Sequence, residues 1–132
     1  MAALNELVAG TERIFRVSCR FRCDSPVHLY ENKTATQLYR IAQEAVGNAI
    51  KHSHATRVEV QLTQQGGMLQ LTIRDNGIGI PDHSPRKGTG MGLYTMGHRA
   101  KMLGGELHVG PDVYGGTLVQ CDVPMPEPHS QS

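Results

Sequence analysis

Two glycine clusters separated by a polar loop lie in the middle of this chain. The first cluster reads Asp75-Asn76-Gly77-Ile78-Gly79-Ile80, and the second reads Gly88-Thr89-Gly90-Met91-Gly92-Leu93. Glycine allows backbone conformations that are closed to other residues and allows a ligand to approach closely. A helix-like apolar pattern begins at Leu93, so we expect a helix N-terminus there, with free N–H groups and a positive dipole end that favour an anion. The stretch therefore predicts a place where the backbone approaches phosphate.

Asp75 ends an alternating run in which Leu69, Leu71 and Ile73 share one face. Because side chains alternate along a strand, Asp75 is expected on the same inward face. An inward carboxylate costs on the order of several kcal/mol unless hydrogen-bond donors satisfy it, so protein groups or a ligand must pair with it. Taken singly, each glycine pair is more typical of a turn. A dinucleotide-binding motif is excluded, because the glycines do not follow its strand, Gly-x-Gly-x-x-Gly, helix order.

Length and composition favour one small domain. The chain has 132 residues, 39% of them hydrophobic, and a formal net charge of +1, which gives no case for nucleic acid or an anionic membrane as partner. It contains no apolar run long enough to span a bilayer and no signal-peptide pattern, so we expect no membrane insertion. The three cysteines form no Cys-x-x-Cys pair, and Cys19 and Cys23 on one strand would lie about 13 Å apart, too far for a disulfide. These features favour a reduced, cytoplasmic chain.

The periodicity of apolar residues predicts three helices and five strands. Residues 1–13 are expected to be a linker helix from a region upstream, residues 14–124 the domain, and residues 125–132 a disordered tail. The first helix is expected at 4–15, the second from an N-cap at Thr34 or Thr36 to residue 50, and the third at 93–103, ended by a Gly104-Gly105 cap. The strands are expected at 17–23, 57–62, 69–75, 106–109 and 117–123. This order predicts an α+β fold, a two-layer sandwich with a mixed, mostly antiparallel sheet and helices on one face.

The second helix also carries a polar stripe. Arg40, Glu44, Asn48 and Lys51 follow one another at helical spacing. Such a stripe is ordinarily a solvated face. It nevertheless presents a carboxylate, an amide oxygen and a cation in line, which suit activation of a hydroxyl group, ligation of Mg²⁺ and contact with phosphate.

Taken in order, these motifs resemble the ATP-binding domain of the gyrase, heat-shock chaperone, histidine kinase and mismatch-repair superfamily. The matching residues are Glu44-x-x-x-Asn48 with Lys51-His52, Asp75-x-Gly77-x-Gly79, Gly88-x-Gly90-x-Gly92-Leu93 and Gly116-Thr117. Within that superfamily, residues 14–124 resemble the catalytic domain of a bacterial two-component sensor histidine kinase. The helix that begins Gly-Leu-x-x-Met-x-x-Arg-Ala is similar to the nitrate- and membrane-fluidity-sensing subfamily.

The resemblance implies a role for each motif. Asp75 would accept the adenine amino group, with Thr117 beside it acting through water. Asn48 would ligate Mg²⁺, Glu44 would polarise the attacking group or a metal-bound water, and Lys51 would meet phosphate oxygens. The glycines at 88, 90 and 92 would let a lid close over the triphosphate. The further nucleotide contacts that the resemblance implies are His52, Gly77, Gly79, Ile80, Thr89, Met91 and Leu93.

The implied reaction is in-line transfer of the γ-phosphoryl group of ATP to a histidine. That histidine would lie on a separate dimerisation domain of the same kinase, with a response regulator as indirect partner, and the isolated domain is expected to be monomeric. His52 and His98 are expected to be structural or exposed, not phosphoacceptors. Residues 81–90 have almost no apolar anchor and are expected to be disordered without nucleotide.

Three alternatives share parts of this pattern. A serine kinase of the anti-sigma-factor type carries the same motifs and differs in its acceptor. A molecular-clamp ATPase would need a further domain that supplies a lysine. A non-catalytic module would bind nucleotide only to regulate contacts, but the presence of both Glu44 and Asn48 argues against it.

Overall fold

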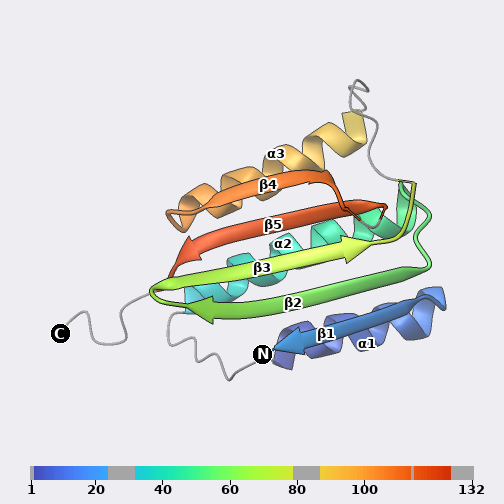
Figure 1. The fold of residues 1–132 in the computed structure, drawn as a ribbon, viewed down its shortest axis with the longest axis horizontal. Helices are drawn as coiled ribbons and strands as arrows, with labels where there is room; N and C mark the ends of the chain where they lie inside the picture. Colours follow the sequence, from blue (N-terminus) through green and yellow to red (C-terminus); the bar gives the residue numbers. More distant parts are fainter. Residues whose placement is uncertain (1, 24–31, 79–86, 114, 126–132) are drawn as a thin grey trace.

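The computed structural model describes residues 2–23, 32–78, 87–113 and 115–125. Three helices and five strands lie in these ranges (Figure 1). They are α1 (Ala2–Phe15), β1 (Ser18–Cys23), α2 (Asn32–Lys51), β2 (Arg57–Gln65), β3 (Met68–Asp75), α3 (Lys87–Met102), β4 (Glu106–Pro111) and β5 (Thr117–Pro124).

The strands form one mixed sheet in the order β1-β2-β3-β5-β4. β1 runs parallel to β2, and every other neighbouring pair is antiparallel. All three helices lie behind the sheet in Figure 1, so one face is covered and the other is open. The predicted α+β fold with helices on one face is confirmed.

The core lies between the sheet and the helices, as the period-two pattern predicts. Alternate apolar residues of the three central strands are buried; they are Val58, Val60, Leu62, Leu69, Leu71, Ile73, Val119, Cys121 and Val123. The apolar side of α2 packs on them through Leu38, Ile41, Ala42 and Ala45. Leu4 and Val8 of α1 join the same core, and each buried aliphatic side chain contributes about 1.5–3 kcal/mol.

The C-terminus of α3 follows the predicted glycine cap. Gly104 has a φ of 76°, its N–H donates to the Lys101 carbonyl at 2.9 Å, and the Gly105 N–H donates to the Ala100 carbonyl at 2.9 Å. These two bonds form a Schellman motif, which satisfies carbonyl groups that the helix leaves unpaired.

Two helix N-termini differ from the prediction. α2 begins at Asn32, so Thr34 and Thr36 lie inside the helix and neither is its N-cap. α3 begins at Lys87, six residues before Leu93, so the backbone of the second glycine cluster is helical. No proline interrupts residues 87–93, and glycine costs only about 1 kcal/mol in a helix, so the sequence does not prevent the earlier start.

All three cysteines are free thiols, as expected. Burial raises the pKa of Cys19 to about 11 and that of Cys121 to about 12, because the low-dielectric core disfavours a thiolate. None of the helices in the described ranges is both long and apolar enough to cross a membrane.

Candidate functional site

Asp75 is the last residue of β3, and its side chain is inward as the alternation predicts. The residue is 8% exposed. One carboxylate oxygen accepts the Gly77 N–H at 2.8 Å, and the carboxylate also accepts the backbone N–H of Thr117. Burial raises the pKa of Asp75, the two N–H groups oppose that shift, and the nearby negative charge of Asp112 adds to it. No ion pair to this carboxylate is found in the part of the chain that the structure describes, and two N–H groups orient it to accept further hydrogen bonds.

Thr117 lies beside this carboxylate at the start of β5. It is 4% exposed, and its hydroxyl group has no hydrogen-bond partner among the described residues. An unpaired buried hydroxyl costs about 1–3 kcal/mol, so such groups usually have a partner in the functional state. Asp75 and Thr117 together therefore present an acceptor and an unpaired hydroxyl at one end of the sheet.

Two glycines allow the backbone to close around Asp75. Gly116 has a φ of 85°, and a Cβ there would collide with the carbonyl oxygen of Asp75. A Cβ on Gly77 would collide with the carbonyl oxygen of Ser53, which accepts the Ile78 N–H at 2.9 Å. The first contact joins the β4–β5 turn to β3, and the second joins the segment after β3 to the segment after α2.

Asn76 has a structural role that the motif analysis did not assign. Its side-chain oxygen accepts the N–H groups of Thr56 and Arg57 at 2.9 Å each, and its amide donates to the Thr56 hydroxyl at 2.9 Å. Asparagine commonly bonds to backbone groups in turns, and this was the signal in the sequence. The residue fixes the end of β3 to the start of β2.

The polar stripe of α2 faces the first turns of α3. Glu44 and Asn48 are half-buried. A Cβ on Gly92 would lie 2.5 Å from Oε2 of Glu44 and 3.5 Å from Nδ2 of Asn48. The fold thus brings Gly92 of the second glycine cluster against the carboxylate and the amide, which the sequence could place only on separate elements.

The remaining predicted residues differ in how far the structure describes them. Lys51 and His52 are exposed at the C-terminal end of α2, and Leu93 is half-buried against the core. Gly79 and Ile80 lie outside the described residues, as does most of the segment expected to be disordered. Lys87 to Gly90 are helical, and the disorder expected for residues 81–90 without nucleotide stays a prediction.

His98 is exposed on α3 and stacks on Tyr94, with ring centroids 6.4 Å apart. Both histidines that were considered as acceptors, His52 and His98, are therefore at the surface. This agrees with their predicted structural or exposed character.

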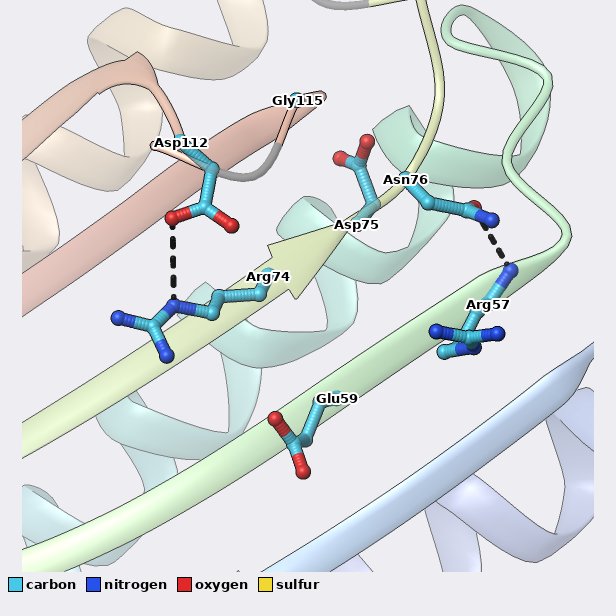
Figure 2. Close-up of a pocket in the computed structure, with 7 residues that line it drawn as sticks. All are labelled: Arg57, Glu59, Arg74, Asp75, Asn76, Asp112 and Gly115. Atoms are coloured by element: carbon cyan, nitrogen blue, oxygen red, sulfur yellow. Dashed lines mark hydrogen bonds and ion pairs between the residues drawn. The ribbon is translucent and has the colours of Figure 1, made fainter.

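A hollow lies on the open face at the same end of the sheet (Figure 2). It has a volume of about 270 Å³ and is lined by Arg57, Glu59, Arg74, Asp75, Asn76, Asp112 and Gly115. Arg74 and Asp112 form an ion pair across it, with 3.4 Å between Nε and Oδ1. The sequence analysis did not single out Asp112, because nothing local marks its partner.

The chain matches the family described as histidine kinase-, DNA gyrase B-, and HSP90-like ATPase over residues 33–127. It is 28% identical over 124 residues to the oxygen sensor histidine kinase NreB of Staphylococcus carnosus; the match covers 94% of this chain and 36% of that protein. The chain thus spans about a third of the length of this relative.

Two solved structures show the same fold. The ATP-binding domain of PrrB from Mycobacterium tuberculosis superposes with a TM-score of 0.75 at 24% identity, covering 96% of this chain and 93% of that one. The histidine kinase domain of a blue-light activated histidine kinase from Erythrobacter litoralis has a TM-score of 0.73 at 26% identity, covering 94% and 60%.

The fold and the site thus define an ATP-binding domain of the two-layer α/β type. The chain belongs to the family of histidine kinase-, DNA gyrase B- and HSP90-like ATPases.

Proposed function

We propose that this chain binds Mg-ATP and donates the γ-phosphoryl group to a histidine on a separate dimerisation domain, as part of two-component signal transduction. The observation that carries the proposal is the buried Asp75 carboxylate beside the unpaired Thr117 hydroxyl, in a chain of this ATPase family. The similarity to NreB, an oxygen sensor histidine kinase, favours a histidine as the acceptor.

Asp75 and Thr117 are proposed to recognise the adenine. The exocyclic amino group of adenine is a donor, whereas guanine carries a carbonyl acceptor at the same position. A carboxylate accepts from the first and repels the second. Two of its hydrogen bonds come from the backbone N–H groups of Gly77 and Thr117, so the carboxylate is oriented before the base arrives.

The triphosphate is proposed to lie along the polar stripe of α2. Lys51 and His52 are exposed cations or donors at one end of the stripe, and Glu44 and Asn48 lie further along, against Gly92. Gly77 and Gly79 on one side, and Gly88 to Gly90 in the first turn of α3 on the other, would bring free backbone N–H groups to the nucleotide. Ile80, Thr89 and Met91 remain predicted contacts.

The donors present fit Mg²⁺ of the kind that enters with ATP. Mg²⁺ is typically held by one or two oxygen ligands of the protein together with substrate phosphates and water. No group of three His, Cys, Asp or Glu side chains gathers in the described ranges, but Asn48 offers an amide oxygen next to the Glu44 carboxylate. When bound, the ion would neutralise phosphate charge. Asn48 is the proposed ligand, and Glu44 the group that orients the attacking nucleophile.

The partners follow from the proposed reaction. The acceptor histidine would come from the dimerisation domain of the same kinase, and a response regulator would receive the phosphoryl group afterwards. We propose that the domain by itself is monomeric and works in the cytoplasm.

Calorimetric titration tests nucleotide binding. ATP should bind with micromolar to sub-millimolar affinity in the presence of Mg²⁺, and Asp75→Asn should weaken binding roughly 10- to 100-fold, since a hydrogen bond to a charged group contributes about 1.5–3 kcal/mol. Asp122→Asn on the open face is the matched control and should bind like the wild type. Equal affinity of the Asp75 variant and the wild type would contradict the adenine contact.

Phosphotransfer requires the missing acceptor. Supplying a histidine-bearing helical hairpin with labelled ATP should give an acid-labile phosphohistidine, and Asn48→Asp or Glu44→Ala should abolish it. A product that is stable to acid would instead indicate a serine kinase and overturn the histidine assignment.

A further inference from the structure

Asp112 is a largely buried carboxylate just beyond β4, and its partner comes from β3. Its side chain is 6% exposed, and Oδ1 lies 3.4 Å from Nε of Arg74, whose side chain is 44% exposed. A buried charge is costly unless it is paired, and removing one partner leaves the other uncompensated. The Arg74–Asp112 pair therefore fixes a position, unlike an ion pair in which both groups are solvated.

Arg74 immediately precedes Asp75 and points to the opposite face of the sheet. The alternation puts Ile73 and Asp75 on the covered face and Arg74 on the open face, where Figure 2 shows its guanidinium group directed toward Asp112. The end of β3 thus presents the Asp75 carboxylate on the covered face and, on the open face, the Arg74 side chain, which anchors Asp112.

The anchor holds the turn that carries Thr117. The last ladder pairs next to this turn are Pro111 with Thr117 and Arg74 with Leu118, so Asp112 and Gly116 lie beyond both ladders. Within the turn, the Asp112 N–H donates to the Gly116 carbonyl at 3.1 Å, and the Gly115 N–H donates to the Asp112 carbonyl at 3.0 Å. A displacement of Asp112 would therefore displace Gly116 as well.

Gly116 connects this turn to the candidate site. It packs so closely on the Asp75 carbonyl group that no Cβ could fit. The next residue is Thr117, whose backbone N–H is bonded to the Asp75 carboxylate and whose hydroxyl is unpaired. The relative position of carboxylate and hydroxyl thus depends on where the turn lies.

We propose that Arg74 and Asp112 are positioning residues for base recognition: their ion pair on the open face holds the β4–β5 turn so that Thr117 meets the base that Asp75 binds. The inference rests on the proposed function, because it presumes that Asp75 and Thr117 contact adenine. Neither Arg74 nor Asp112 is proposed to touch the nucleotide itself.

The test is calorimetric titration of ATP and GTP into Arg74→Gln, Asp112→Asn and the double variant. Each single variant should bind ATP roughly five- to tenfold more weakly and should lose part of the preference for ATP over GTP, a coupling of ordinary size between connected sites. The double variant should be no weaker than the worse single variant, because both remove one interaction. Arg74→Lys keeps the charge and should restore most of the affinity.

The matched control is another ion pair of the open face, Arg22 with Glu59, 3.7 Å apart. Arg22 lies on β1, which is not a neighbour of β3 in the sheet, so Arg22→Gln should leave the affinity for ATP and the base preference unchanged. If Arg74→Gln lowers only the melting temperature and leaves affinity and base preference as in the wild type, the pair has a purely structural role and the inference is overturned.

The failure of the inference can be told from the failure of the proposed function. If the wild-type protein binds no ATP, or Asp75→Asn binds as well as the wild type, the adenine contact itself is wrong. If Asp75→Asn abolishes binding while the Arg74 and Asp112 variants bind normally, only the positioning role is wrong.

Discussion

The two faces of the sheet differ in whether their polar groups have partners within the chain. On the open face, charged and amide groups are paired within the chain: Arg74 with Asp112, Arg22 with Glu59, and Asp122 with both Gln70 and Gln120 at 2.9 Å. On the covered face, Asp75 is held by backbone N–H groups, and the Thr117 hydroxyl has no partner among the described residues. Polar groups that have partners within the chain stabilise the fold and fix the positions of the segments that carry them. Those left unsatisfied on the covered side mark where a ligand is expected.

The largest effect on stability should come from Gly116, where the turn meets β3. Gly116→Ala combines a φ of 85° with a collision against the Asp75 carbonyl oxygen. We expect it to lower the free energy of unfolding by about 2–4 kcal/mol and to weaken ATP binding.

Gly115→Ala is its matched control. Gly115 has a φ of 95°, but nothing lies within 4 Å of its Cβ position, so the cost should be only about 1–2 kcal/mol. Urea unfolding of both variants distinguishes the cost of a positive φ from the cost of the steric contact. Equal losses in the free energy of unfolding would mean that the close approach of Gly116 to Asp75 does not affect stability.

Asp75→Asn should stabilise the domain while it disables binding. Because burial raises the folded-state pKa of Asp75 above its unfolded value, the charged form is disfavoured in the folded protein, and stability is lost as pH rises through the folded pKa. The variant cannot ionise, so at neutral pH its free energy of unfolding should be higher than that of the wild type.

The gain should shrink as pH falls toward the unfolded value of about 3.9, where Asp75 is protonated in both states. Unfolding curves at several pH values measure this trend. A gain that stays constant with pH would show that the charge of Asp75 is not its origin.

Alanine substitutions at two glycines of α3 should distinguish the effect of contact with the polar stripe of α2 from the effect of helix propensity. Gly97→Ala meets nothing within 4 Å and should stabilise the domain by about 0.5–1 kcal/mol. Gly92→Ala gains the same propensity, but its Cβ would lie 2.5 Å from Oε2 of Glu44, so the Glu44 side chain must move. The rate of phosphotransfer to a supplied histidine-bearing hairpin should therefore fall in Gly92→Ala and not in Gly97→Ala. Equal rates in the two variants would contradict a role for Glu44 in the reaction.

The smallest effect should come from the exposed pair on the open face. The side chains of Arg22 and Glu59 are 56% and 35% exposed, so solvent screens their attraction. Arg22→Gln should change the free energy of unfolding by less than about 0.5 kcal/mol. Repeating the measurement at high salt should remove even that difference, and a loss above 1 kcal/mol would contradict the distinction between exposed and buried pairs.

The sequence by itself determined the features that depend on local spacing. The two-residue period put Asp75 inward, because Leu69, Leu71 and Ile73 had to face the core. The Gly104-Gly105 pair predicted the end of α3, because a left-handed residue closes a helix. The helical spacing of Glu44 and Asn48 put them on one side of α2.

Only the tertiary structure decided which of these local features meet. The pairing of β5 with both β3 and β4 brings Thr117 to Asp75 and Asp112 to Arg74, and the packing of α3 on α2 brings Gly92 to Glu44. The start of α3 was missed because glycines permit a helix as well as a loop, so the local sequence does not choose between them. Local patterns constrain residues within about a turn of one another, whereas these contacts join residues far apart in the chain, and strand register and helix packing alone fix them.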